Sequence, residues 1–160
     1  MKALVTGGCG FIGSNLAKRL IREGWEVDIV DDMSSGTLNL LADSVGYAKL
    51  RVIPDASLLG KYEEVEKTAR KKNELLVLQD DFACDEMLDR ISRGTYDFIF
   101  HQAAIPRVLY SVENPAITTE TNVFKTSKLF EASIGSVNRI IFASSSSVYG
   151  GPENLPISID

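Results

Sequence analysis

A run of glycines close to the start of the chain constrains its fold more than any other feature. The apolar segment 2–6 leads directly into Gly7, Gly10 and Gly13, and an amphipathic stretch follows. This spacing predicts a strand, a tight turn and a helix. We expect Gly7 to adopt a positive φ, Gly10 to let the backbone approach a diphosphate, and Gly13 to let the helix pack closely on the strand.

The glycine loop also narrows the class of ligand. The first N–H groups of a helix have no partner within the helix, and the helix dipole is positive there, so a diphosphate is stabilised at this point. A Walker-type loop is excluded, because Ser14 and Asn15 stand where Lys and Ser or Thr are required. The alternative that stays open is a glycine-rich turn without a ligand.

A pair of acidic residues, Asp31 and Asp32, ends the next apolar segment, about 20 residues beyond the loop. An acidic residue at this point accepts hydrogen bonds from the adenosine ribose and repels a 2′-phosphate. The pair therefore predicts NAD rather than NADP as the cofactor, with Asp31 on the ribose and Asp32 facing solvent. The alternative is that both are solvated turn residues.

Short apolar runs alternate with longer amphipathic stretches, which is typical of a parallel sheet covered by helices. We predict an α/β, Rossmann-type doubly wound sheet with strand order 3-2-1-4-5. The five expected strands are Lys2–Thr6, Glu26–Val30, Leu75–Leu78, Phe98–His101 and Arg139–Ala143.

Three helices are expected between the strands, at Phe11–Glu23, Asp85–Arg93 and Pro115–Ala132. The first has an apolar stripe formed by Phe11, Ile12, Leu16, Leu20 and Ile21. The stretch Asn39–Asn73 is too long for an ordinary crossover, and we interpret it as an insertion. It contains a candidate helical face made of Leu59, Tyr62, Val65 and Ala69.

Composition excludes several classes of function. The 160 residues suit one domain, and the formal net charge of −5 without a long basic run argues against a nucleic-acid partner. No apolar stretch is long enough to span a membrane. The two cysteines, Cys9 and Cys84, suggest neither a disulfide nor a metal site, and no room for a signal peptide precedes the first strand. We therefore expect a cytoplasmic protein without a metal.

Several motifs resemble those of the extended short-chain dehydrogenase/reductases, specifically the NAD-dependent nucleotide-sugar epimerases and dehydratases related to UDP-glucose 4-epimerase. The similar segments are Thr6–Gly13 (TGGCGFIG), Val30–Gly36 (VDDMSSG), Asp81-Phe82, His101–Ala104 (HQAA), Asn122–Ala132 and Ala143–Gly150 (ASSSSVYG). Lys125 departs from the pattern, because the family helix that begins with Asn-Val has glycine there.

The resemblance implies which residues contact NAD. Besides the three glycines and Asp31, they are Phe11, Ile12, Met33, Ser35, Gly36, Asp81, Phe82, Ala103, Ala104, Asn122 and Ser144. It also implies that Ser145, three residues before Val148, is the catalytic hydroxyl, which hydrogen-bonds the sugar hydroxyl or its ketone during hydride transfer. His101 is interpreted as structural, and Tyr149 is not the family's catalytic tyrosine.

The family reaction also uses a Tyr-x-x-x-Lys pair, which these 160 residues do not contain. We therefore interpret residues 1–160 as an incomplete NAD-binding domain, truncated before the last strands and the substrate-binding lobe. We predict that it is inactive alone and forms homodimers or aggregates through exposed edges. The full-length enzyme would act on a nucleotide sugar through a transient keto-sugar.

Three alternatives to an epimerase stay open. The chain could be a natural short protein that binds NAD without catalysis, such as a sensor. It could also be a related reductase or a dehydratase. Dehydratases of the family carry an acidic pair where this chain has Ser146 and Ser147, and this difference favours the isomerase reaction of an epimerase.

Overall fold

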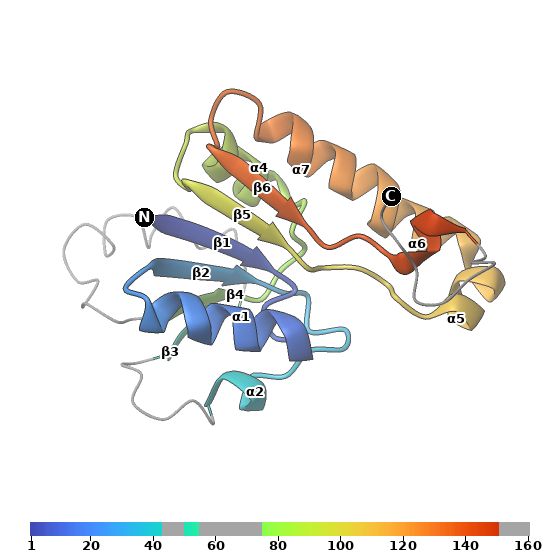
Figure 1. Ribbon diagram of the computed structural model, residues 1–160, viewed down its shortest axis with the longest axis horizontal. Helices are drawn as coiled ribbons and strands as arrows, with labels where there is room; N and C mark the ends of the chain where they lie inside the picture. Colours follow the sequence, from blue (N-terminus) through green and yellow to red (C-terminus); the bar gives the residue numbers. More distant parts are fainter. Residues whose placement is uncertain (43–49, 55–74, 151–160) are drawn as a thin grey trace.

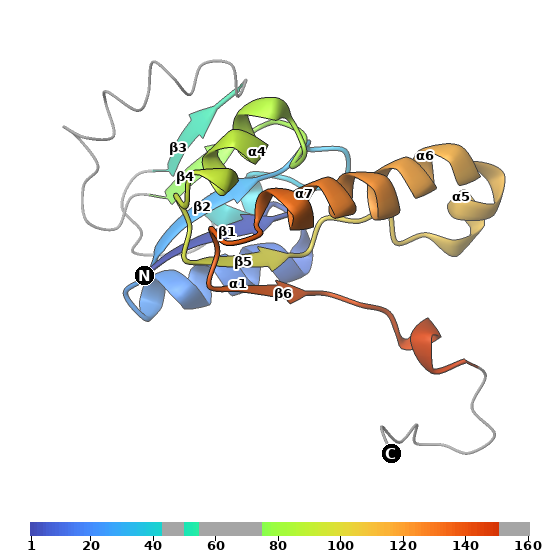
Figure 2. The same ribbon diagram turned by 90° about the horizontal axis from the view of Figure 1, so that it is seen from above.

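The computed structural model describes residues 1–42, 50–54 and 75–150. These residues form a parallel sheet in the order β3-β4-β2-β1-β5-β6, with helices on both faces (Figures 1 and 2). The strands are β1 (Lys2–Thr6), β2 (Glu26–Val30), β3 (Leu50–Ile53), β4 (Leu75–Leu78), β5 (Phe98–His101) and β6 (Arg139–Phe142).

Helix α1 (Phe11–Arg22) covers one face of the sheet, while α4 (Asp85–Ser92) and α7 (Thr126–Ala132) cover the other (Figure 2). The remaining elements are α2 (Asn39–Ala42), α5 (Val108–Glu113), α6 (Pro115–Thr119), a π-helical segment η2 (Glu120–Lys125) and a 3₁₀ turn η3 (Ser146–Tyr149). In the described part of the chain, no helix is long and apolar enough to cross a membrane.

The predicted doubly wound sheet is confirmed, and the five predicted strands occur in the predicted order. Two strand predictions need correction. The last strand ends at Phe142, one residue early, and the sequence-based prediction missed β3, which extends the sheet beyond β4. The predicted helical face at residues 59–69 lies outside the described residues.

Alternating side chains of the strands build two apolar layers. Ala3 and Val5 of β1 face α1, where they pack with Ala17 and Leu20. Leu4 points to the opposite face and belongs to a cluster that also contains Val30, Leu78, Met87, Ile91 and Leu129. Each fully buried aliphatic side chain contributes about 2 kcal/mol, so the two layers fix the sheet between its helices.

The predicted apolar stripe of α1 is wrong at its first two positions. Phe11 is 77% exposed and Ile12 is 66% exposed. The buried face consists instead of Gly13, Ser14, Ala17 and Leu20. The reason is that Gly13 has to lie against the glycine loop, and this contact rotates the helix so that the residues one and two positions earlier face outward.

A buried ion pair joins β2 to α4. The carboxylate of Asp28 is fully buried and lies 3.5 Å from the guanidinium Nη2 of Arg90 and 3.4 Å from Nζ of Lys2. Nε of Arg90 also donates a hydrogen bond to the hydroxyl of buried Tyr96, at 3.3 Å. These polar contacts link α4 to β2 and so help to position the helix on the sheet.

Candidate functional site

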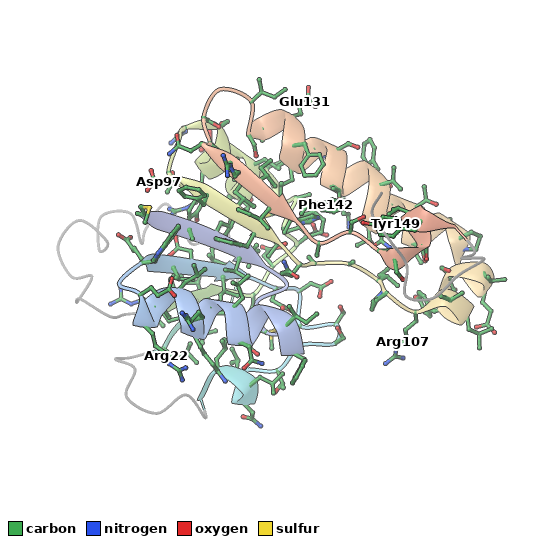
Figure 3. All side chains as sticks on the ribbon, viewed as in Figure 1. Arg22, Asp97, Arg107, Glu131, Phe142 and Tyr149 are labelled. Atoms are coloured by element: carbon green, nitrogen blue, oxygen red, sulfur yellow. The ribbon has the colours of Figure 1, made fainter. Side chains whose placement is uncertain are left out.

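The predicted site residues follow the carboxyl ends of β1, β2, β4, β5 and β6. Since these strands are parallel, their arrowheads point the same way and the following loops meet at one edge of the sheet (Figure 1). Figure 3 shows Arg107 and Tyr149 beyond this edge, whereas Asp97 and Arg22 lie toward the opposite one. Ligands of open α/β sheets bind outside the carboxyl ends of the strands.

The glycine loop has the close packing that its sequence predicts. Gly7 has a φ of +65°, as predicted, and a Cβ there would lie 2.8 Å from the backbone nitrogen of Ala103. A Cβ on Gly13 would collide with the carbonyl oxygen of Gly7. Gly10 is less crowded, because its Cβ would meet only that same oxygen, at 3.3 Å. The loop therefore packs tightly against the protein at Gly7 and Gly13 and leaves more space at Gly10.

The amino end of α1 begins at this opening. Gly10 is its N-cap, and no side chain of the described residues caps the helix. Phe11 and Ile12 supply the first two helical positions. Their backbone N–H groups belong to the set that has no acceptor within an α-helix, so this end can stabilise an anion.

Asp31 connects the end of β2 to the glycine loop. Its Oδ2 accepts a hydrogen bond from the backbone N–H of Cys9 at 2.8 Å, and its Oδ1 accepts one from the N–H of Met33 at 2.9 Å. The residue is only 7% exposed, and burial raises the pKa of its carboxyl group. Asp32 is exposed, as predicted, and accepts hydrogen bonds from Ser34.

The sequence-based prediction missed this bracing role of Asp31. The bond to Met33 is an aspartate turn that the sequence could have suggested. The bond to Cys9 could not be foreseen, since it joins residues on two different strand ends. Each carboxylate oxygen can accept a further hydrogen bond, so Asp31 keeps the capacity to bind a ribose.

The segment after Asp31 folds against the glycine loop. Thr37 donates its N–H to the carbonyl oxygen of Cys9 at 3.0 Å, and a Cβ on Gly36 would lie 2.8 Å from Cβ of Cys9. Met33 has a positive φ of 60°, and Ser35 is exposed. Burial raises the pKa of the Cys9 thiol to about 12, which keeps it protonated and unreactive.

The predicted pair Asp81-Phe82 divides into two environments. Phe82 is buried, and its ring contacts His101 with centroids 4.9 Å apart. Asp81 stays partly exposed; its Oδ1 accepts the N–H of Ala83 at 2.8 Å, and its Oδ2 lies 2.6 Å from Nζ of Lys125. The polar member of the pair thus faces the site edge, while the apolar member belongs to the core.

The end of β5 is held by a threonine and an asparagine. Oγ1 of Thr6 accepts the N–H of Ala103 at 3.2 Å. Asn122 exchanges two hydrogen bonds with the backbone of Ile105, at 2.8 and 3.0 Å. Ala104 lies exposed between them. Asn122 therefore fixes the backbone of this loop.

Ser144 and Ser145 follow β6 and are exposed. Oγ of Ser145 accepts the N–H of Ser147 at 3.2 Å and caps η3. The structure places this loop at the same sheet edge as the glycine loop (Figure 1). His101 lies in the core, as a structural residue would, between hydroxyls of Thr6 and Thr126.

Comparisons with known proteins agree with this geometry. A sequence model of the NAD dependent epimerase/dehydratase family matches residues 3–160. A bifunctional UDP-glucose 4-epimerase and UDP-xylose 4-epimerase of Pisum sativum is 29% identical over 156 residues, which cover 97% of this chain and 39% of that protein.

Two solved structures extend the likeness to three dimensions. A UDP-N-acetylglucosamine 4-epimerase of Methanobrevibacter ruminantium M1, in complex with UDP-N-acetylmuramic acid, is 30% identical with a TM-score of 0.73, covering 99% of this chain and 42% of its own. A UDP-glucose 4-epimerase of Bifidobacterium longum, in complex with NAD⁺ and UDP, is 25% identical with a TM-score of 0.72, covering 100% of this chain and 42% of its own. This chain thus spans about two fifths of the length of these relatives.

Proposed function

The chain belongs to the NAD dependent epimerase/dehydratase family, and from this membership we propose that residues 1–160 are the NAD-binding domain of a nucleotide-sugar epimerase. The observation that carries the proposal is the pair of hydrogen bonds by which Asp31 joins the glycine loop to the end of β2. This contact holds a carboxylate beside the amino end of α1, and the proposal is that the carboxylate binds the ribose while the helix end stabilises the diphosphate.

The residues present fit NAD. The loop leaves room beside Gly10, α1 offers its first N–H groups, and the carboxylate of Asp31 disfavours a 2′-phosphate by charge repulsion. Met33, Ser35 and Gly36 form the segment beside this carboxylate. Ala103, Ala104 and Asn122 line the next strand end, on the side where we expect the nicotinamide half of the cofactor.

The chemistry of the proposed reaction is hydride transfer. When bound, NAD would supply the hydride acceptor: the carbon that bears the reacting sugar hydroxyl would lose a hydride to it and later regain one, and the hydroxyl would lose a proton. Ser145 is the group of this chain that would hydrogen-bond the reacting oxygen, and Ser144 would lie near the cofactor. The proton of the sugar hydroxyl needs a base, which the family supplies from a Tyr-x-x-x-Lys pair that these 160 residues lack.

The proposed substrate is a nucleotide sugar, and epimerisation is favoured over dehydration because Ser146 and Ser147 are not acidic. Cytoplasmic localisation and homodimer formation stay predictions. The proposed function makes one claim that the chain itself can test, namely selective binding of NAD.

The test is calorimetric titration of the purified chain with NAD and with NADP. We expect saturable NAD binding and NADP binding at least tenfold weaker, since an interaction of about 1.4 kcal/mol gives that ratio. Asp31→Asn should weaken NAD binding about tenfold and reduce the preference over NADP, because it removes the charge that selects the ribose.

Asp32→Asn is the matched control, because it removes the same charge from an exposed neighbour that bonds only Ser34 among the contacts described. Thermal melting of each variant reports whether the fold is intact. A folded chain that binds neither dinucleotide, or an Asp32→Asn variant that loses as much affinity as Asp31→Asn, would overturn the proposal.

A further inference from the structure

The ion pair between Lys125 and Asp81 is the polar contact at the site edge that the proposed function leaves unexplained. Nζ of Lys125 lies 2.6 Å from Oδ2 of Asp81, and the two side chains are 27% and 33% exposed. Lys125 is the last residue of η2, and Asp81 lies between β4 and α4. The pair therefore joins two separate elements and remains open to solvent on one side.

The sheet order indicates which part of a dinucleotide would meet this pair. The diphosphate site lies at the end of β1 and the ribose carboxylate at the end of β2, and β4 is the next strand in the sheet. A base attached to that ribose continues outward over the end of β4, where Asp81 lies. The hydrogen bond to Asp81 raises the pKa of the Lys125 ammonium, so this group is positively charged where it meets Asp81.

The two charged groups differ in what they recognise on a purine. A carboxylate accepts a hydrogen bond from the 6-amino group of adenine but repels the 6-oxo group of hypoxanthine. An ammonium donates to an oxo group and has no acceptor for an amino group. Oδ1 of Asp81 is bonded to Ala83 and Oδ2 to Lys125, which leaves each oxygen one further acceptor position.

We propose that Lys125 is a specificity-determining residue that lets the site edge beside Asp81 accept the base of a 6-oxopurine dinucleotide as well as that of NAD. The inference rests on the proposed function, because it requires that the dinucleotide lies across the ends of β1, β2 and β4. In this proposal Asp81 accepts a hydrogen bond from the amino group of adenine, and Lys125 donates one to the oxo group of hypoxanthine. A glycine at position 125 would leave Asp81 without this donor.

The experiment compares two probes, NAD and nicotinamide hypoxanthine dinucleotide, by calorimetry on the folded chain. We expect the wild-type chain to bind the two with similar affinity. Lys125→Met should weaken binding of the hypoxanthine dinucleotide about tenfold relative to NAD, the effect of losing one charge-assisted hydrogen bond, and so shift the ratio of the two affinities toward NAD. Lys125→Arg keeps a donor and should retain most of the affinity for the hypoxanthine dinucleotide.

Lys128→Met is the matched control, because it removes a positive charge one helical turn away, where Lys128 lies over the ring of Phe124 instead of beside Asp81. It should affect neither probe. Equal losses for both probes in Lys125→Met, or a wild-type chain that binds NAD and rejects the hypoxanthine dinucleotide, would overturn the inference and leave NAD binding intact. Failure of the folded wild-type chain to bind either probe would overturn the proposed function and this inference with it.

Discussion

Two glycines of the same loop differ in the space that they leave for a side chain. A Cβ on Gly13 would collide with the carbonyl oxygen of Gly7, whereas a Cβ on Gly10 would lie 3.3 Å from the same atom. We predict that Gly13→Ala lowers the free energy of unfolding by about 2 kcal/mol, the usual effect of overpacking. Gly10→Ala should lower it by less than about 1 kcal/mol.

Urea denaturation of both variants measures this difference. The two substitutions add the same methyl group, so the comparison isolates the effect of position. Equal stability of the two variants would show that the loop relaxes around a side chain at Gly13. Gly10→Ala has a second expected effect, weaker NAD binding, because the methyl group enters the proposed diphosphate position.

The imidazole of His101 links three elements of the core. Its Nδ1 lies 2.7 Å from Oγ1 of Thr6, and its Nε2 lies 3.0 Å from Oγ1 of Thr126. Because Oγ1 of Thr6 accepts hydrogen bonds from the N–H groups of Gln102 and Ala103, we infer that its hydroxyl donates to Nδ1. Nε2 then carries the proton and donates to Thr126, so the bonded form of the ring is neutral.

This arrangement predicts how stability changes with pH. Burial lowers the pKa of His101 from its ordinary value of 6.5 to about 4, so the unfolded chain takes up a proton first as the pH falls. The stability that the neutral ring contributes is present above about pH 6.5 and is lost as the pH falls toward 4. Between about pH 7 and about pH 5 we expect a loss of about 2 kcal/mol from this group.

His101→Gln removes the titration and keeps an amide that can bond both threonines. Urea denaturation at the two pH values should show a smaller pH dependence for the variant than for the wild-type chain, by about 2 kcal/mol. An unchanged pH dependence would mean that other groups dominate the acid sensitivity. The measured quantity is the difference in pH dependence between the variant and the wild-type chain, because carboxyl groups elsewhere in both proteins titrate in the same range.

Much of the site was predictable from residue types at fixed spacing. The contacts between residues far apart in sequence were not predictable. The positive φ of Gly7 and the exposure of Asp32 were predictable, since both follow from local backbone chemistry. The bond from Cys9 to Asp31 and the contact of Lys125 with Asp81 were not, because each joins residues far apart in sequence. Direct contacts of these residues with NAD stay predictions.

At the scale of elements, the Asp28–Arg90 pair determines how α4 lies on β2. Arg90→Met removes a cation from the fully buried carboxylate of Asp28, and we predict a loss of about 3 kcal/mol in the free energy of unfolding. Arg93→Met is the control, because Arg93 pairs with Asp89 on the exposed surface of the same helix. That change should cost less than about 1 kcal/mol.

Thermal and urea unfolding of the two variants test this prediction. Replacing Asp28 by Asn in the Arg90→Met background should restore part of the lost stability, since it removes the buried charge. Equal losses from Arg90→Met and Arg93→Met would contradict the buried role of the pair. The double variant separates lost charge compensation from lost packing of the arginine side chain.

Two elements escaped prediction for physical reasons. Strand β3 is four residues long, lies at the sheet edge among the described strands and carries Arg51 in its centre, so its apolar signal is weak. The π-helical segment Glu120–Lys125 interrupts an otherwise regular helical pattern, and side-chain periodicity does not distinguish one wider turn. Long buried strands such as β1 and β2 were predictable because their apolar runs are continuous.

At the scale of the whole molecule, the proposed chemistry needs the Tyr-x-x-x-Lys pair of the family reaction, and the 160 residues do not contain this motif. We predict that the chain with NAD does not interconvert UDP-glucose and UDP-galactose, because the sequence motif that would supply the base for the sugar hydroxyl's proton is absent. A coupled assay that follows the released product measures this. The prediction would be contradicted if the wild-type chain turned over substrate well above the rate of its Ser145→Ala variant.

The order of the sheet was predictable because connection rules act on the whole chain. Right-handed crossovers between parallel strands leave few arrangements for a glycine loop followed by alternating helices and strands. These rules do not predict which apolar surface of the folded chain stays exposed. Helix α5 extends beyond the carboxyl edge of the sheet and contains no buried residue (Figures 1 and 2).

This uncovered apolar surface predicts self-association. Val108 and Val112 lie one turn apart on α5 and are exposed, as are Ile117, Val123 and Phe124 of the following helical segments and Phe142 of β6. An exposed apolar set of this kind favours contact with a second molecule, and the formal net charge of −5 gives only modest repulsion. We predict that the chain sediments as dimers or larger species at high concentration.

Val112→Lys places a charge in the middle of this surface and should shift the chain toward monomer in sedimentation velocity. Asn15→Lys is the matched control, because it adds the same charge to an exposed position of α1, on the other face of the sheet. If the wild-type chain sediments as a monomer at high concentration, the prediction is wrong and these exposed apolar side chains do not drive association. If both lysine variants dissociate the oligomer equally, net charge controls association and the α5 surface does not.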